Sequence, residues 1–434
     1  MSDNQRDAGL VRVVGPWGLA ASVISIVVGA GIFAVPGVLA ACIGPYAPIA
    51  FLVCTIAIAA VAICFAEGGS RIPTSGGAYG YIEAAFGKLV GYIAGTLLYV
   101  SAALACGGVA AALADVAVSV VPQHLAIPVH AAVIVVVIGG IALVNMGGVA
   151  RGARLVNAST MVKLMPLAIF VIAGAGAIHR ANFARTSVPV TAGLGRALIL
   201  ALFALTGMET PLAASGEIKE PERTIPRGLT VGLASVAFLY VAIQVIAQGI
   251  LGPALANSSV PLADAMGRIS PALRVLMLAG AALSMFGWIS CDLLGSPRTL
   301  FAFGRDGLLP RALGRVHPRS HAPHIAILCY AVLATMLALT GTFAELAVLS
   351  TLATAALYAA GCAAAWRLAR DGVALAGAPL NFRWLGAAMV VGIGSMLAMI
   401  AMASRVEILG LVVVIVASAA IYLVQTIGAP MLKR

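Results

Sequence analysis

Residues 13–66 contain no Asp, Glu, Lys or Arg, and this long apolar run restricts the folds that the chain can adopt. A membrane-crossing helix needs about 20 predominantly apolar residues, so the run is long enough for two. Gly44-Pro45 marks the turn between them. Similar segments cover nearly all of the 434 residues, of which 62% are hydrophobic and 9% are charged. Because roughly a quarter of the residues in soluble domains are charged, the sequence predicts one polytopic membrane unit.

Ten further apolar segments bring the expected number of transmembrane helices to twelve, so the expected fold class is all-α. Residues 1–14 form a charged tail, which we expect in the cytoplasm, and we interpret the helix after it as uncleaved. The run 325–366 is divided at Thr340-Gly341-Thr342. The ten segments are approximately 88–113, 126–147, 154–178, 194–216, 227–250, 273–300, 324–341, 344–366, 383–403 and 406–428.

The formal net charge of +11 is explained by the loops between these segments. Lys and Arg gather mainly in alternate loops, which favours a cytoplasmic position for both termini, although the loop at 179–196 is an exception. We therefore expect a multi-pass protein of the plasma (inner) membrane, surrounded by the lipid bilayer. No compact basic run with interleaved aromatic residues is present, so nucleic-acid binding is not expected.

No pattern in the sequence indicates an enzyme or a metal site. The seven cysteines form no CxxC pair and lie in apolar segments, where cysteines are typical packing residues. P-loop, triad and HExxH patterns are absent from the sequence. Glu67 and Glu345 lie at the ends of expected helices and need no functional explanation. We expect no cofactor, no metal ion and no enzymatic activity.

Two charged residues lie alone within membrane-length segments. Lys163 is the only charged residue within 155–178, and Glu209 is the only one within 197–216. A charge at bilayer depth costs at least a few kcal/mol, so it marks an ion or substrate pathway by default. These two residues predict a transport function.

Glycine and proline interrupt the first and sixth expected helices at matching places. Gly29 and Gly31 precede Pro36 in the first, and Gly207 precedes Pro211 in the sixth. An unwound turn exposes N–H groups that bind a carboxylate and carbonyl groups that accept an ammonium group. An α-amino acid carries both charges on one carbon atom. The alternative is that the small residues only allow close helix packing.

Four sequence motifs carry a resemblance to a known family. They are Gly29-Ala-Gly-Ile-Phe33 with Pro36, Ser75-Gly-Gly-Ala-Tyr79, Phe203-Ala-Leu-Thr-Gly-Met-Glu209 followed by Glu217-Ile-Lys-Glu-Pro-Glu-Arg-Thr-Ile-Pro226, and Arg298-Thr-Leu-Phe-Ala-Phe-Gly-Arg-Asp-Gly-Leu-Leu-Pro310. In this order they resemble the amino acid–polyamine–organocation (APC) superfamily of permeases. The match runs from about residue 15 to the end of the tenth expected helix.

The resemblance implies both a fold and a function. The fold would be LeuT-like, with two inverted five-helix repeats at 15–178 and 194–369, discontinuous helices 1 and 6, and two peripheral helices at 383–428. The function would be secondary transport of an amino acid by alternating access. Transport would be coupled to a proton or to the exchange of a second amino acid. A homodimer is compatible with the resemblance.

The helix breaks and the resemblance together assign a substrate site. Backbone amides at the first break would hold the carboxylate, and the sixth helix would form the opposite wall. The residues are Val28, Gly29, Ala30, Gly31, Ile32, Phe33, Leu104, Phe203, Leu205 and Gly207. Phe203 stands where arginine/agmatine antiporters carry a tryptophan, and Leu104 replaces another aromatic residue. The incomplete aromatic box weakens arginine as the substrate and suits a neutral side chain.

Four further residues are assigned to coupling or gating. Tyr99 matches a gating tyrosine of the antiporter branch and could donate a hydrogen bond to Glu209, which matches an acid that senses pH. Lys163 resembles a lysine of a proton-coupled branch whose ammonium occupies a sodium position. The alternatives are structural roles, with Glu209 tied to a fixed donor and Lys163 permanently charged. Asp292 could recognise a cationic side chain, relay a proton, or pair with a cytoplasmic Arg.

Two rival functions stay open from the sequence. One is an arginine/agmatine-type or polyamine antiporter, in which Asp292 and Glu209 would bind the cationic end of the substrate. The other belongs to a different class: a channel, or an amino acid receptor with the same fold that does not transport.

Overall fold

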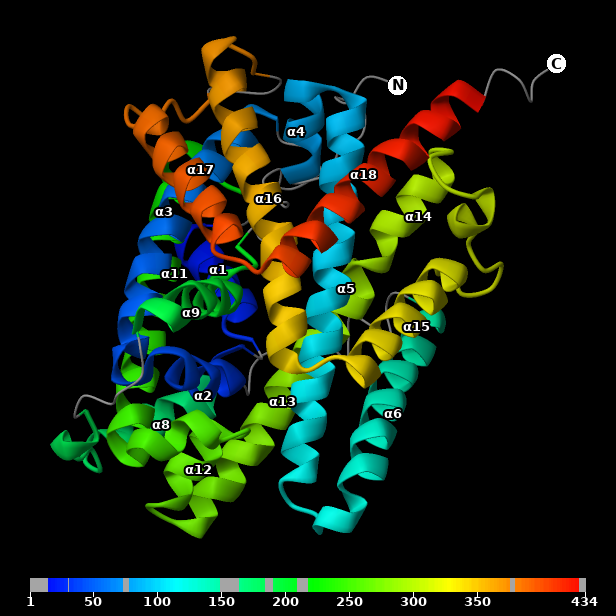
Figure 1. Ribbon diagram of the computed structural model, residues 1–434. Helices are drawn as coiled ribbons and strands as arrows, with labels where there is room; N and C mark the ends of the chain where they lie inside the picture. The colour runs from blue at the N-terminus through cyan, green and yellow to red at the C-terminus, as the bar shows by residue number, and fades with distance from the viewer. Residues whose placement is uncertain are drawn as a thin grey trace.

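The computed structural model describes residues 15–29, 31–72, 78–148, 164–183, 190–208, 218–374 and 379–428. These ranges form helices joined by short turns, so the expected all-α class is confirmed for the described chain (Figure 1). Backbone N–H and C=O groups find no water in a bilayer, and a helix satisfies them within one segment. The apolar composition therefore leads directly to this architecture.

Among the described residues, seven helical stretches are long and apolar enough to cross a membrane. They are α2 (Gly31–Ile43) with α3 (Ala47–Arg71), α5 (Lys88–Val118), α6 (Ala126–Met146), α11 (Pro221–Leu251), α13 (Pro271–Gly295) with α14 (Pro297–Arg305), α16 (Phe343–Arg370) and α18 (Arg405–Gly428). Five shorter apolar helices accompany them: α1 (Pro16–Val27), α8 (Leu164–Ala175), α9 (Val190–Leu205), α15 (His324–Thr340) and α17 (Leu385–Ala401). Two short helices, α4 (Ala78–Phe86) and α12 (Pro261–Gly267), lie at opposite ends of the bundle in Figure 1. The full set of twelve spans and the inverted repeat stay predictions.

The first span is interrupted where the sequence predicts a break. α1 ends at Val27, the next two described residues are not helical, and α2 begins at Gly31. α9 ends at Leu205, and Gly207 has a φ of +111°, in the left-handed region that favours glycine. Residues 209–217 lie outside the described chain, so the continuation of the sixth span is not seen.

The expected division of the run 325–366 is also confirmed. α15 ends at Thr340 and α16 begins at Phe343. The Glu345 N–H donates to Thr342 Oγ1 at 3.3 Å, and the Thr342 N–H donates to Glu345 Oε2 at 3.0 Å. This reciprocal capping box satisfies donors that a helix start leaves free, which explains where α16 begins.

Burial separates an inner set of helices from an outer set. α5 and α16 pack against each other and bury most of their residues, whereas α18 runs along the outside of the bundle (Figure 1). α6 and α18 expose large apolar side chains such as Val136 and Val424. Exposed apolar faces on helices of this length fit contact with lipid.

Candidate functional site

The break after α1 and the end of α9 lie directly against each other. A Cβ atom placed on Gly31, the first residue of α2, would lie 3.1 Å from the Cα of Ala204 in α9. A Cβ atom on Gly207 would lie 3.2 Å from Cγ2 of Ile26 in α1. The break in the first span therefore contacts the end of α9 from both sides, and glycine permits this close approach at both places.

Polar atoms converge on the backbone of the first break. The N–H groups of Val28 and Gly29 donate to Ile24 O at 2.9 Å and to Val27 O at 2.8 Å. From α11, the hydroxyl of Tyr240 donates to Val27 O at 2.8 Å. The first N–H groups of a helix have no partner within that helix, and in α2 they point out of its start at Gly31. The break thus presents peptide groups of both polarities in one small region.

α13 supplies two side chains to this break that the sequence analysis missed. Ser284 Oγ donates to Gly29 O at 3.5 Å. One turn further on, Cδ1 of Trp288 lies 2.7 Å from the place where a Cβ on Gly29 would be. The spacing of four residues puts both on one face of α13, but only the packing of α13 against Gly29 reveals their position.

The structure brings some of the predicted wall residues of the site close together. Phe203 Cδ1 lies 3.8 Å from a Cβ placed on Gly31, and its ring packs edge-on against Phe343 with centroids 5.7 Å apart. From α16, the hydroxyl of Tyr358, another residue missed from the sequence, accepts from Gly207 N at 3.4 Å. The other predicted wall residues vary in burial: Val28, Ile32, Phe33 and Leu205 are buried, and Leu104 of α5 is partly buried.

Three of the predicted residues lie outside the described chain: Ala30, Lys163 and Glu209. The expected hydrogen bond from Tyr99 to Glu209 therefore stays a prediction. In the described chain, Tyr99 packs edge-on against Tyr330 of α15, with ring centroids 5.5 Å apart.

Asp292 lies in a second polar cluster on α13, one turn beyond Trp288. Ser296 Oγ donates to its Oδ1 at 2.7 Å, and the hydroxyl of Tyr330 donates to its Oδ2. The thiol of Cys106 in α5 is a third hydrogen-bond partner. The ion pairs described in the structure do not include Asp292, so the expected Arg partner is not seen in the described chain.

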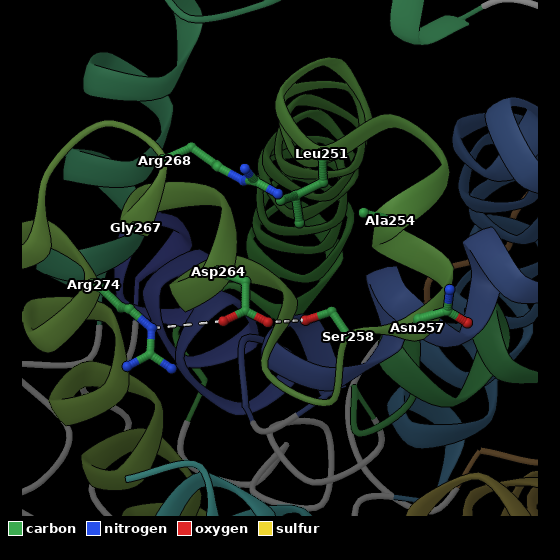
Figure 2. Close-up of a pocket in the computed structure, with 8 residues that line it drawn as sticks. All are labelled: Leu251, Ala254, Asn257, Ser258, Asp264, Gly267, Arg268 and Arg274. Atoms are coloured by element: carbon green, nitrogen blue, oxygen red, sulfur yellow. Dashed lines mark hydrogen bonds and ion pairs between the residues drawn. The ribbon is translucent and has the colours of Figure 1, made fainter.

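A separate polar cavity of about 340 Å³ lies at the end of the molecule that carries α12 (Figure 2). Inside it, Asp264 lies 3.6 Å from Arg274 Nε and accepts from Ser258 Oγ at 2.5 Å. None of its lining residues belongs to the helix breaks or to the Asp292 cluster. Across the part of the chain that the structure describes, no group of three or more His, Cys, Asp or Glu residues could hold a metal ion.

Comparison with known proteins agrees with this architecture. The model of a family described as amino acid permease matches residues 14–429. A branched-chain amino acid permease of Bacillus subtilis is 26% identical over 375 residues, which is 80% of this chain and 79% of the relative. A methylthioribose transporter of the same organism is 27% identical over 339 residues, or 74% of each chain. An uncharacterised transporter of Mycobacterium tuberculosis is 32% identical over 355 residues, covering 79% of this chain and 77% of the relative. The chain belongs to the amino acid permease family, within the APC superfamily.

Proposed function

We propose that this protein is a secondary permease for an amino acid with a neutral side chain. The family and the names of its relatives support a transport role in a membrane. The observation that carries the finer proposal is the interrupted first span, whose second half begins at Gly31 against α9. A zwitterion fits this place because the described residues of the site offer peptide groups of both polarities.

The start of α2 would bind the substrate carboxylate. Its free N–H groups and the positive end of the helix dipole favour an anion there. Carbonyl groups at the ends of α1 and α9 would accept the ammonium group. Phe33, Leu104 and Phe203 would surround the side chain, and apolar walls favour a neutral one. As predicted from the sequence, the backbone of Ala30 would help to bind the carboxylate, and the acid Glu209 would sense pH.

Unequal burial of the two half-helices supports alternating access. The buried residues among the twelve of α1 are Leu19, Ala20, Val23 and Val27. In α2, ten of thirteen residues are buried. The site is therefore enclosed on the α2 side, and α1 is the less buried half. In our proposal α1 moves against the other helices to open and close the site towards the cytoplasm.

The surroundings of Asp292 favour a neutral substrate over arginine, agmatine or a polyamine. In the rival antiporter, its carboxylate would bind the cationic end of the substrate. Here both carboxylate oxygens already accept hydrogen bonds, from Ser296 and from Tyr330. A cationic substrate would have to compete with these donors, which already occupy part of the acceptor capacity of the carboxylate.

Uptake into proteoliposomes tests the proposal. The panel contains leucine, valine, alanine, arginine, agmatine, putrescine and methylthioribose, the last because one relative is named for it. We expect saturable uptake of at least one neutral amino acid. Uptake confined to arginine and amines would favour the rival, and a continuous electrical current would indicate a channel.

The variant Gly31→Ala tests the site itself. The added Cβ would press on Ala204, so we expect uptake to fall roughly tenfold or more, because small misplacements of binding groups have large effects. Gly139→Ala on α6 is the matched control, since a Cβ there meets no atom within 4 Å. If both variants transport like the unmodified protein, the break at Gly31 does not form the site.

A further inference from the structure

We propose that Asp292 is a proton-binding site, separate from the substrate contacts, which α5, α13 and α15 build together. Through this site the movement of substrate would be coupled to a proton. The coupling part rests on the proposed transport function, whereas proton binding by Asp292 can be tested without it.

The carboxylate of Asp292 is surrounded by donors that carry no charge. They are the hydroxyls of Ser296 and Tyr330 and the thiol of Cys106. Tyr330 and Cys106 are fully buried, whereas Asp292 is only partly buried. These partners hold the carboxylate from the interior of the bundle.

No cation offsets the charge of this acid within the described chain. The titratable groups that face it are Tyr99 and Cys106 from α5 and Tyr330 from α15. The described parts of α6, α8, α12 and α14, which also pack against α13, add no titratable partner. A lone charge within a membrane-length helix costs at least a few kcal/mol. Binding a proton removes that charge without requiring a second side chain.

The same cluster can serve both protonation states. The ionised carboxylate accepts from the three donors. After a proton binds, the carboxyl O–H can donate to the oxygen of Tyr330, because a phenol both donates and accepts and its hydrogen can rotate. The carboxyl group therefore keeps a hydrogen-bond partner in both protonation states, so it can titrate within the packed helices.

α13 connects this acid to the substrate site. Trp288, which contacts the break at Gly29, precedes Asp292 by one helical turn. A substrate that displaces Trp288 would move α13 relative to α15 and separate Asp292 from Tyr330. The ionised form would lose a donor and the protonated form an acceptor, so the proton affinity would depend on substrate occupancy. One proton would enter from one side of the membrane and leave on the other, with no other chemical change.

Infrared spectroscopy of the purified protein in lipid nanodiscs tests proton binding directly. A protonated carboxyl group gives a C=O band that disappears when it ionises. We expect one such band to be absent from Asp292→Asn at every pH. Tyr330→Phe, which keeps the acid but removes a donor, should keep the band and shift the pH at which it disappears. If Asp292→Asn has the same bands as the unmodified protein throughout the titration, the proposal is wrong.

Transport assays test the coupling. With any substrate that the unmodified protein takes up, Asp292→Asn should lose at least tenfold of the accumulation driven by a pH gradient and should keep substrate exchange without a gradient. Asp371→Asn, an exposed acid at the end of α16, is the control and should keep both activities. Unchanged pH-driven accumulation in Asp292→Asn would overturn the coupling. If the unmodified protein transports no amino acid, the proposed function fails, and the infrared titration still decides whether Asp292 binds a proton.

Discussion

Two carboxylates inside the helical bundle, Glu67 of α3 and Asp292 of α13, differ in how the protein satisfies them. Glu67 is 0% exposed, and its Oε1 lies 2.7 Å from a guanidinium nitrogen of Arg71. Both Glu67 oxygens also accept backbone N–H groups, from Asn381 at 3.2 Å and from Phe382 at 3.0 Å. Asp292 has only hydroxyl and thiol partners in the described chain. A permanent countercharge fits a structural role, and neutral donors leave an acid free to titrate.

The Glu67 cluster fastens the connection between α16 and α17 to the end of α3. Arg71 donates to Val373 O at 3.2 Å and to Asn381 Oδ1 at 2.6 Å. Asn381 has a φ of +51°, a left-handed conformation that asparagine tolerates better than most residues. Glu67 therefore has a structural role, which agrees with the expectation that it needs no functional explanation.

The largest effect that this comparison predicts is for Arg71→Ala. Removing the guanidinium leaves Glu67 buried without its countercharge, which typically costs about 3–5 kcal/mol. We expect the free energy of unfolding, measured by denaturant titration in detergent micelles, to fall by that amount. The double variant Glu67→Gln with Arg71→Gln removes both charges and should recover part of the loss. A loss below about 1 kcal/mol for Arg71→Ala would mean that the ion pair is not what stabilises this connection.

A smaller effect is expected for Asp292→Asn. The amide keeps one oxygen that can accept from Tyr330 or Ser296, so about one hydrogen bond, or about 1 kcal/mol, is lost. The same unfolding titration measures it. A loss as large as that of Arg71→Ala would place Asp292 with the structural acids and would weaken the contrast between the two sites.

The smallest effect is expected for Asp371→Asn at the cytoplasmic end predicted for α16. Its carboxylate lies 3.7 Å from Nε of Arg367, and both side chains are 54% exposed. Exposed pairs of this kind contribute about 0.5 kcal/mol or less. A near-zero change in unfolding free energy would show that an ion pair alone contributes little, and that burial of the Glu67–Arg71 pair causes the large loss expected for Arg71→Ala.

Features that depend on neighbouring residues could be predicted from the sequence. The helical segments, the break before Gly31 and the division at 340–342 all follow from local hydropathy and from glycine, proline and capping residues. The four motifs also indicated the family, which the match over residues 14–429 confirms. Hydropathy placed the helix ends less well: the segment expected at 88–113 is part of α5, which extends to Val118.

Contacts between distant residues could not be predicted in this way. Asp292 was recognised as unusual, yet its partner Cys106 lies on a helix far away in the sequence. Trp288 and Tyr358 have no distinguishing local pattern, because a tryptophan or a tyrosine in an apolar helix is most often a packing residue. Their positions at Gly29 and Gly207 became visible only with the helices packed.

The sequence by itself determined that this protein is a bundle of apolar helices, one of them interrupted, in the amino acid permease family. The reason is physical. A bilayer forces each segment to form its backbone hydrogen bonds within itself, so the residues of that segment determine where a helix forms and where it breaks. The tertiary structure alone decided that the Glu67–Arg71 pair, which a spacing of four residues on α3 brings together, also holds Asn381, and that the hydroxyl of Tyr330 meets Asp292. Those contacts depend on which distant segments of the chain meet, and no spacing along a single helix specifies them.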